Sequence, residues 1–230
     1  MNAVSQFFAD RLADPAVDLM VQTMAAVRAD AAFGQQPWDA AAGAALSDET
    51  PAGLDNGALE TVMARIEQAA ALDATAAEQA AKDGRAAEIA ALPSPLREVA
   101  LAALKRKRWR FGGFGIRRLP LLTDMDAGGD GAFVELMRIE PGRGVPDHDH
   151  ADDEVTLILT GAYDDGHHRY GPGDISLAQP GFTHTPKADV GEVCYVLAIS
   201  YGPPLLAGPY RLLQPILAEP ADAKAVWRTR

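Results

Sequence analysis

The sequence predicts an α+β protein of two domains, a helical domain over residues 1–92 and a strand-rich domain over residues 96–220. Alanine dominates the first part, and alanine favours helix. Valine, isoleucine, leucine, aromatic residues and Gly/Pro turns mark the second part, and this composition favours strands. Pro93 and Pro95 interrupt the helical pattern between the two parts. A chain of 230 residues is long enough for one large or two small domains.

The helical domain is expected to be an all-α bundle of amphipathic helices. Asp14 and Pro15 predict the start of one helix, because aspartate is a good N-cap and proline suits the first helical position. An apolar stripe at helical spacing follows them. We predict helices over residues 3–12, 15–33, 57–71 and 75–90, and a short helix over 96–105 that joins the two domains.

Short segments with the composition of strands fill the second domain. Residues 192–201 are apolar on both faces, as in a strand at the centre of a sheet. The basic segment 105–118 is interpreted as a solvated sheet edge, where lysine and arginine discourage pairing with another chain. We predict strands over residues 107–111, 114–122, 132–140, 154–160, 174–178, 192–201 and 209–216.

The net charge of −11 is unevenly distributed. Residues 1–95 hold 14 acidic and 5 basic residues, a net charge of −9, which leaves −2 for residues 96–230. This acidity argues against an extended nucleic-acid-binding surface. No apolar run of about 18 residues predicts a membrane span, and the first residues do not resemble a secretory signal. The single cysteine, Cys194, cannot form an internal disulfide, so we expect a cytoplasmic protein.

The first of two motifs that carry chemistry reads G-x5-H-x-H-x3-E-x6-G and spans residues 142–161. His148 and His150 are two residues apart, so on a strand both side chains point to one face. Glu154 keeps that face if the strand continues. The second motif, G-x5-Q-P-G-x2-H, starts about thirty residues after the start of the first and ends at His184. Three imidazoles and one carboxylate suit a divalent transition metal such as zinc, iron, manganese, nickel or copper.

Both motifs resemble those of the cupin superfamily. The first matches at all five positions, whereas the second has Gln179 where proline is usual, and Ala188 follows where asparagine is common. The resemblance implies a C-terminal antiparallel β-barrel, or jelly roll, with one divalent metal ion inside. Zinc is the first expectation, with iron, manganese and nickel as alternatives. The implied ligands are His148, His150, Glu154 and His184.

The chain as a whole resembles a narrower family, the ChrR-type anti-sigma factors, which join a helical sigma-binding domain to a C-terminal cupin. The resemblance is best in VPDHDH (145–150), TLILTGAY (156–163) and RYGPGDI (169–175). It implies a transcription regulator that sequesters an extracytoplasmic-function sigma factor through residues 1–92 and senses oxidative stress through its metal-bound cupin. It implies no direct contact with nucleic acid or membrane. An acidic helical domain fits this role, because it complements the basic surface of a sigma factor.

One feature of that family is missing from the helical domain. Many members hold a second zinc ion there, with an upstream histidine and an H-x3-C-x2-C motif. Met24, Arg28 and Ala31 stand at the positions of that motif, and the sequence has no histidine before His148 and no cysteine before Cys194. The N-terminal zinc site is therefore absent, and the bundle would depend on the apolar packing of its helices.

A metal-dependent cupin enzyme, dioxygenase-like and with a helical accessory domain, is the alternative interpretation. A site of three histidines and one glutamate can leave coordination positions open for a substrate. No general base stands out beside the ligands, however. The nearby acidic residues are interpreted as rim residues: Asp147, Asp149, Asp152 and Asp153.

Two further features are interpreted as structural. His167 and His168 lie in a polar turn, DDGHHRY, and are expected to be exposed there rather than to bind metal. Cys194 falls in the apolar segment 192–201, so we expect an inert thiol in the core.

Overall fold

The structure is a computed structural model that describes residues 2–30, 85–113, 115–122 and 132–213. The predicted helix over 57–71 lies outside these ranges, as does most of the helix predicted over 75–90. The end of the latter is α5 (Ala86–Ala90). Within the described ranges, no helix is both long and apolar enough to cross a membrane.

Contacts divide the chain into two compact units, one of residues 1–28 with 93–230 and one of residues 29–92. The boundary near residue 92 agrees with the break at Pro93. The first two helices, by contrast, group with the strand-rich part of the chain. The predicted helical domain over residues 1–92 therefore stays a prediction.

Three helices belong to the first unit: α1 (Ala3–Asp10), α2 (Pro15–Asp30) and α6 (Leu96–Arg106). The Asn2 side chain caps α1 by accepting from Ser5 N at 2.8 Å. Asp14 Oδ1 accepts from Ala16 N at 2.8 Å, which confirms the predicted start of α2. The apolar stripe of α2 is buried at Ala16, Val17, Met20 and Val27.

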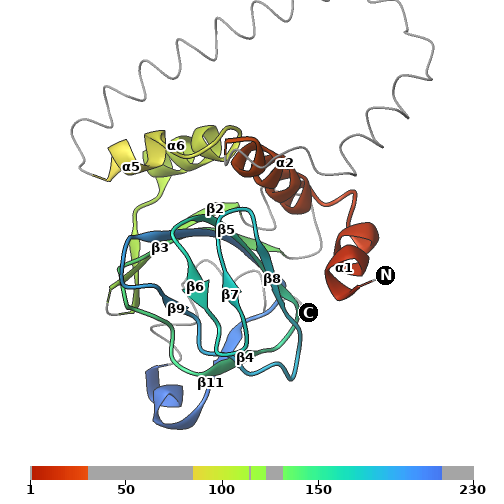
Figure 1. The fold of residues 1–230 in the computed structure, drawn as a ribbon, viewed down its shortest axis with the longest axis vertical. Helices are drawn as coiled ribbons and strands as arrows, with labels where there is room; N and C mark the ends of the chain where they lie inside the picture. Colours follow the sequence, from red (N-terminus) through yellow and green to blue (C-terminus); the bar gives the residue numbers. More distant parts are fainter. Residues whose placement is uncertain (1, 31–84, 114, 123–131, 214–230) are drawn as a thin grey trace, which may run out of the picture. The chain divides into compact units, whose positions relative to one another are not determined.

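The strands of this unit pair in antiparallel fashion (Figure 1). Six of them form one sheet in the order β1-β2-β3-β10-β5-β8, and two smaller sheets have the orders β7-β6-β9 and β11-β4. The bounds are β1 (Arg110–Gly113), β2 (Ile116–Leu122), β3 (Phe133–Ile139), β4 (His148–His150), β5 (Glu154–Thr160), β6 (Tyr163–Asp164), β7 (Arg169–Tyr170), β8 (Ile175–Ala178), β9 (Lys187–Ala188), β10 (Cys194–Ser200) and β11 (Pro204–Leu206).

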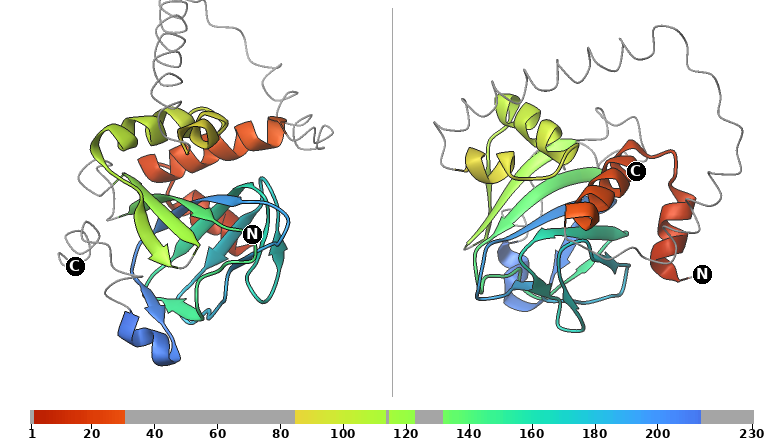
Figure 2. Two further views of the ribbon diagram at one scale, coloured as in Figure 1. Left: turned by 90° about the vertical axis from the view of Figure 1, so that its left-hand side faces the viewer. Right: turned by 45° about the horizontal axis from the view of Figure 1, so that its top comes forward.

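We call residues 110–206 the β-domain; Figure 2 shows it from two further sides. Its antiparallel architecture confirms the predicted fold class of the C-terminal part. The described strands form three sheets and not one closed barrel, so the predicted closure into a jelly-roll barrel is not seen among them.

β10 is the central strand, as its apolar sequence predicts. Every residue of it is buried, and it pairs with β3 on one side and β5 on the other. Cys194 begins this strand, and burial raises the pKa of its thiol to about 12. The cysteine is fully buried in an apolar cluster with Ile116, Ile158 and Val196, which agrees with an inert core thiol.

One predicted strand is wrong. A 3₁₀ helix, η1 (Gly208–Leu213), occupies the start of the strand predicted over 209–216. Pro209 lacks the N–H that a strand ladder needs, and Gly208 has a φ of +56°, so the chain turns there. The basic segment 105–118 does supply a sheet edge, because β1 is the outermost strand of its sheet and Arg108 before it is exposed. Arg118, by contrast, is buried, and Glu135 on the neighbouring β3 neutralises it at 2.5 Å.

Candidate metal site

β4 presents the first two predicted ligands. His148 and His150 lie two residues apart on this strand, so both side chains point to one face, as the spacing predicts. Their exposed fractions are only 3% and 1%. β11 pairs with one edge of β4, with Leu206 opposite His148 and Pro204 opposite His150.

His184, from the second motif, is joined to β4 through the backbone. His148 N donates to His184 O at 3.1 Å, and His184 N donates to His148 O at 2.9 Å. This reciprocal pair brings together residues 36 positions apart in the sequence. The ring centroid of His184 lies 4.5 Å from that of His148 and 5.1 Å from that of His150.

Glu154 reaches the site by a different route from the predicted one. The strand does not continue from His150: β4 ends there, a bend follows at residues 151 and 152, and Glu154 begins β5. Glu154 Oε1 nevertheless lies 3.8 Å from His150 Nε2. Ser200 on β10 donates its hydroxyl to Glu154 Oε2 at 2.6 Å and so orients the carboxylate.

The Nε2 atoms of the three histidines converge. His184 Nε2 lies 3.1 Å from His148 Nε2 and 3.0 Å from His150 Nε2. His148 Nδ1 lies 2.8 Å from the Pro146 carbonyl; if it donates its proton there, the lone pair of Nε2 faces the cluster. Two nitrogens bound at 2.0–2.1 Å to a tetrahedral ion are roughly 3.3 Å apart, close to these separations. The cluster therefore fits one divalent metal ion.

Electrostatics favour the protonation states that a metal requires. Burial, together with the neighbouring His150 and His184, lowers the pKa of His148 to about 4. Burial also lowers the pKa of His184. Burial alone would raise the pKa of Glu154, but a positive charge on His150 and the hydrogen bond from Ser200 outweigh it and hold this pKa below its usual value. Neutral imidazoles and an ionised carboxylate are competent metal ligands.

Asp149 ties the two motifs together, a role that the sequence did not reveal beyond a predicted rim position. Its Oδ1 accepts from His150 N at 2.7 Å and from Gly181 N at 2.9 Å. Gly181 has a φ of +88°, a left-handed conformation that favours glycine, which accounts for the glycine of the second motif.

A cavity of about 70 Å³ is lined by His148, His184 and Glu154. Arg118 and Glu135 also line it, and Arg118 Nε donates to Glu135 Oε2 at 2.8 Å. Burial raises the pKa of Glu135, although the charge of Arg118 opposes this shift. Sequence reasoning missed Arg118, Glu135 and Ser200. In the sequence, the glutamate within the apolar run AFVELM is the one feature that indicates a polar group inside the β-domain.

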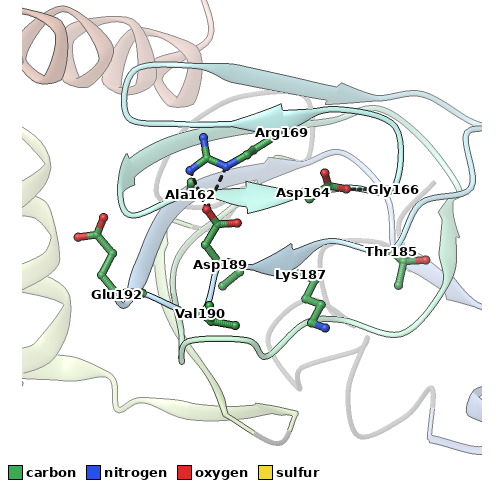
Figure 3. Close-up of a pocket in the computed structure, with 11 residues that line it drawn as sticks. Ala162, Asp164, Gly166, Arg169, Thr185, Lys187, Asp189, Val190 and Glu192 are labelled. Atoms are coloured by element: carbon green, nitrogen blue, oxygen red, sulfur yellow. Dashed lines mark hydrogen bonds and ion pairs between the residues drawn. The ribbon is translucent and has the colours of Figure 1, made fainter.

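The other two histidines lie outside this site. His167 and His168 are exposed in the turn between β6 and β7, as predicted. An open depression of about 560 Å³ lies beside this turn, and none of the four predicted ligands lines it (Figure 3). Arg169 donates to Asp189 there at 2.6 and 2.9 Å. The charged groups of this ion pair are satisfied by each other, so nothing there requires a metal.

The β-domain and its histidine cluster match a known family. The family described as the ChrR cupin-like domain matches residues 97–201. The anti-sigma-E factor ChrR of Cereibacter sphaeroides is 36% identical over 165 residues, which cover 72% of this chain and 71% of that protein. The chain belongs to the ChrR-type anti-sigma factors.

Solved structures of this family and of other cupins are also similar. ChrR in the crystal structure of Rhodobacter sphaeroides SigE in complex with the anti-sigma ChrR is 32% identical, with a TM-score of 0.49, over 84% of this chain and 92% of that chain. An RmlC-like cupin protein from Ralstonia eutropha JMP134 is 17% identical, with a TM-score of 0.40, over 46% of this chain and 69% of that chain.

Proposed function

We propose that this chain is an anti-sigma factor that sequesters a sigma factor and carries one divalent metal ion in its β-domain. The observation that carries the proposal is the 36% identity to an anti-sigma factor, which extends over 72% of the chain. A match of this extent reaches beyond the cupin-like domain of residues 97–201. It therefore includes part of the N-terminal region, where a partner surface is needed.

The metal is proposed to be zinc, bound by His148, His150, Glu154 and His184. Three nitrogen ligands and one carboxylate oxygen complete a tetrahedral set, which suits zinc better than metals that prefer six oxygen ligands. The ion would supply a fixed positive charge among buried imidazoles. Ser200 and Asp149 would hold Glu154 and His150 in place for it.

Residues 1–92 are proposed to bind the sigma factor. Residues 1–95 have a net charge of −9, and this acidity complements the basic DNA-facing surface of such a partner. The absence of histidine and cysteine from this region means that its helices bind without a zinc ion of their own. A protein that sequesters a sigma factor acts in the cytoplasm, in agreement with the single unpaired cysteine.

The relative is named as an anti-sigma factor, a class of protein that acts by binding and not by catalysis. The dioxygenase-like alternative thus has no support from the relative. In the proposed role, the β-domain senses an oxidative signal and changes the affinity of residues 1–92 for the sigma factor.

Co-expression tests the partner. The full chain with an affinity tag would be expressed with Rhodobacter sphaeroides SigE and, separately, with a sigma factor encoded next to its own gene. We expect one of them to co-purify in a 1:1 complex, with cross-links, mapped by mass spectrometry, that start from residues 1–92. Failure of both to co-purify, or cross-links confined to the β-domain, would contradict the assignment.

A reporter assay tests the sensor. In cells that carry a promoter of the sigma factor, His150→Ala should keep the promoter silent under singlet oxygen or peroxide, whereas the wild-type chain releases it. His168→Ala, at an exposed turn, is the matched control and should respond like the wild type. Equal release by His150→Ala and the wild type would leave the metal site without a role in sensing.

A further inference from the structure

Two pairs of neighbouring residues connect the metal site to the outer face of the β-domain. Glu154 and Ser200 are partners in the register of β5 and β10, and their side chains are hydrogen-bonded at 2.6 Å. Asp153 and Tyr201 are the next residues on the two segments, and Tyr201 N donates to Asp153 O at 3.0 Å. The side chains of Asp153 and Tyr201 contact the N-terminal segment rather than the histidine cluster.

The outer pair is held by the N-terminal helices. Arg11 donates to Asp153 Oδ2 at 3.0 Å, and its guanidinium lies 4.7 Å from the Tyr201 ring centroid and 4.4 Å from that of Phe7. The Tyr201 hydroxyl donates to Asp14 Oδ2 at 2.5 Å, and the other oxygen of the same carboxylate caps α2. We call Arg11, Asp14, Asp153 and Tyr201 the latch.

The latch residues and the neighbouring Phe7 are largely shielded from solvent. Phe7 and Tyr201 are each only 3% exposed, and their ring centroids are 5.9 Å apart. The side chains of Arg11 and Asp153 are 24% and 16% exposed. α1 lies beside β8, as Figure 1 shows. Charged hydrogen bonds and cation–π contacts that are shielded from water are stronger than the same contacts on an open surface.

A second contact attaches the far end of α2 to the other metal motif. Arg28 donates from Nη2 and Nε to the carbonyl of Gly173, at 2.9 and 3.1 Å. A Cβ atom at Gly173 would lie 2.9 Å from Arg28 Cγ, so the glycine makes room for the arginine. The start of α2 is thus joined to the segment of Ser200, which holds Glu154, and its far end to the second motif, which ends at His184.

We propose that the latch is a coupling device: metal binding at Glu154 strengthens the docking of α1 and α2 on the β-domain, and docking strengthens metal binding. The inference rests on the proposed function in one respect, the metal ion itself. An ion bound to Glu154 fixes this side chain and, through the Ser200 hydroxyl, the end of β10. Asp153 and Tyr201 are then held in the positions that Arg11 and Asp14 require. Thermodynamic linkage makes the effect reciprocal.

Hydrogen exchange on the full-length chain, with zinc and after its removal by a chelator, tests the coupling. Coupling between two sites in proteins is typically fivefold or more, so zinc should slow the exchange of the α1 and α2 amides by about that factor. Tyr201→Phe keeps the ring between Phe7 and Arg11 and removes only the hydroxyl. In this variant and in Arg11→Ala, the zinc-dependent difference in α1 and α2 should disappear. Zinc affinity, measured by competition with a chelating dye, should fall about fivefold.

Arg169→Ala is the matched control, because it breaks another arginine–aspartate pair, Arg169 with Asp189, that is not part of the latch (Figure 3). It should change neither the exchange of α1 and α2 nor the zinc affinity. Zinc that binds without slowing exchange in α1 and α2, or an unchanged zinc effect in Tyr201→Phe, would overturn the coupling. A wild-type chain that takes up no metal would instead refute the proposed metal site, so the two failures are distinguishable.

Discussion

The five histidines of the chain fall into two groups, and the difference between them shows what makes the metal site. His148, His150 and His184 are at most 4% exposed, and their Nε2 atoms converge. His167 and His168 are exposed, and their backbone N–H groups donate to Asp165 in a turn. Adjacent histidines in the sequence are therefore not sufficient. Two segments must meet by backbone pairing, in an interior that excludes water.

The largest expected effect is a difference in metal content between alanine variants of the two groups of histidines. His184→Ala removes one of three converging nitrogens, so zinc affinity should fall by more than the 10- to 100-fold that is typical for loss of a hydrogen-bond partner of a ligand. Zinc per chain would be measured by elemental analysis after dialysis. His168→Ala should retain one ion per chain, and a loss of metal there would erase the distinction.

The pH dependence of the free energy of unfolding should come from the buried histidines. The pKa of His148 is about 4 in the folded chain against an ordinary value of 6.5, so the unfolded chain binds this proton first as pH falls. The metal-free protein should therefore lose about 3 kcal/mol of stability between pH 6.5 and 4. His184, whose pKa burial also lowers, acts in the same direction. Urea unfolding at a series of pH values would measure the slope.

The variant His168→Ala provides the control for this slope. This side chain is exposed in the turn and is not among the groups that shift the pKa of His148 or His184, so its removal should leave the pH dependence as it is. A flat profile in the wild-type chain, or a profile that changes with His168→Ala, would mean that the buried histidines do not set it.

A smaller effect is expected from Ser200→Ala. The hydroxyl donates to Glu154 at 2.6 Å, and its loss frees the carboxylate to rotate away from the histidines. Zinc affinity should fall about tenfold while the fold is retained. Ser176→Ala, at a buried serine on β8, gives a matched change in the sheet next to β5. An equal loss of affinity in both would indicate general loosening rather than a specific role of Ser200.

The smallest effect is expected at Cys194, whose thiol is a soft metal ligand but lies outside the metal site. The effect concerns the reactivity of this thiol. With a thiol pKa of about 12, roughly one molecule in ten thousand is ionised at pH 8. Iodoacetamide should therefore leave the folded protein unmodified and label it only after unfolding, as mass spectrometry would show. Rapid labelling of the native chain would mean that β10 opens far more readily than its complete burial suggests.

Local patterns in the sequence predict much of this molecule. Alternation places His148 and His150 on one face, Asp14 and Pro15 set the start of α2, and the apolar run of β10 identifies the central strand. These features depend on a few neighbouring residues, so one sequence suffices to find them. The predicted strand at 209–216 is wrong because Gly208 and Pro209 favour a turn.

The tertiary structure alone decided how distant segments meet. The backbone bridge between His148 and His184, the hydroxyl of Ser200 on Glu154 and the burial of Arg118 against Glu135 each join separate strands. The same holds for the contacts of Arg11 and Arg28 with the β-domain, more than 140 residues away in sequence. Sequence spacing encodes periodicity within a strand or helix. It does not encode which strand lies beside which, because that depends on the packing of the whole core.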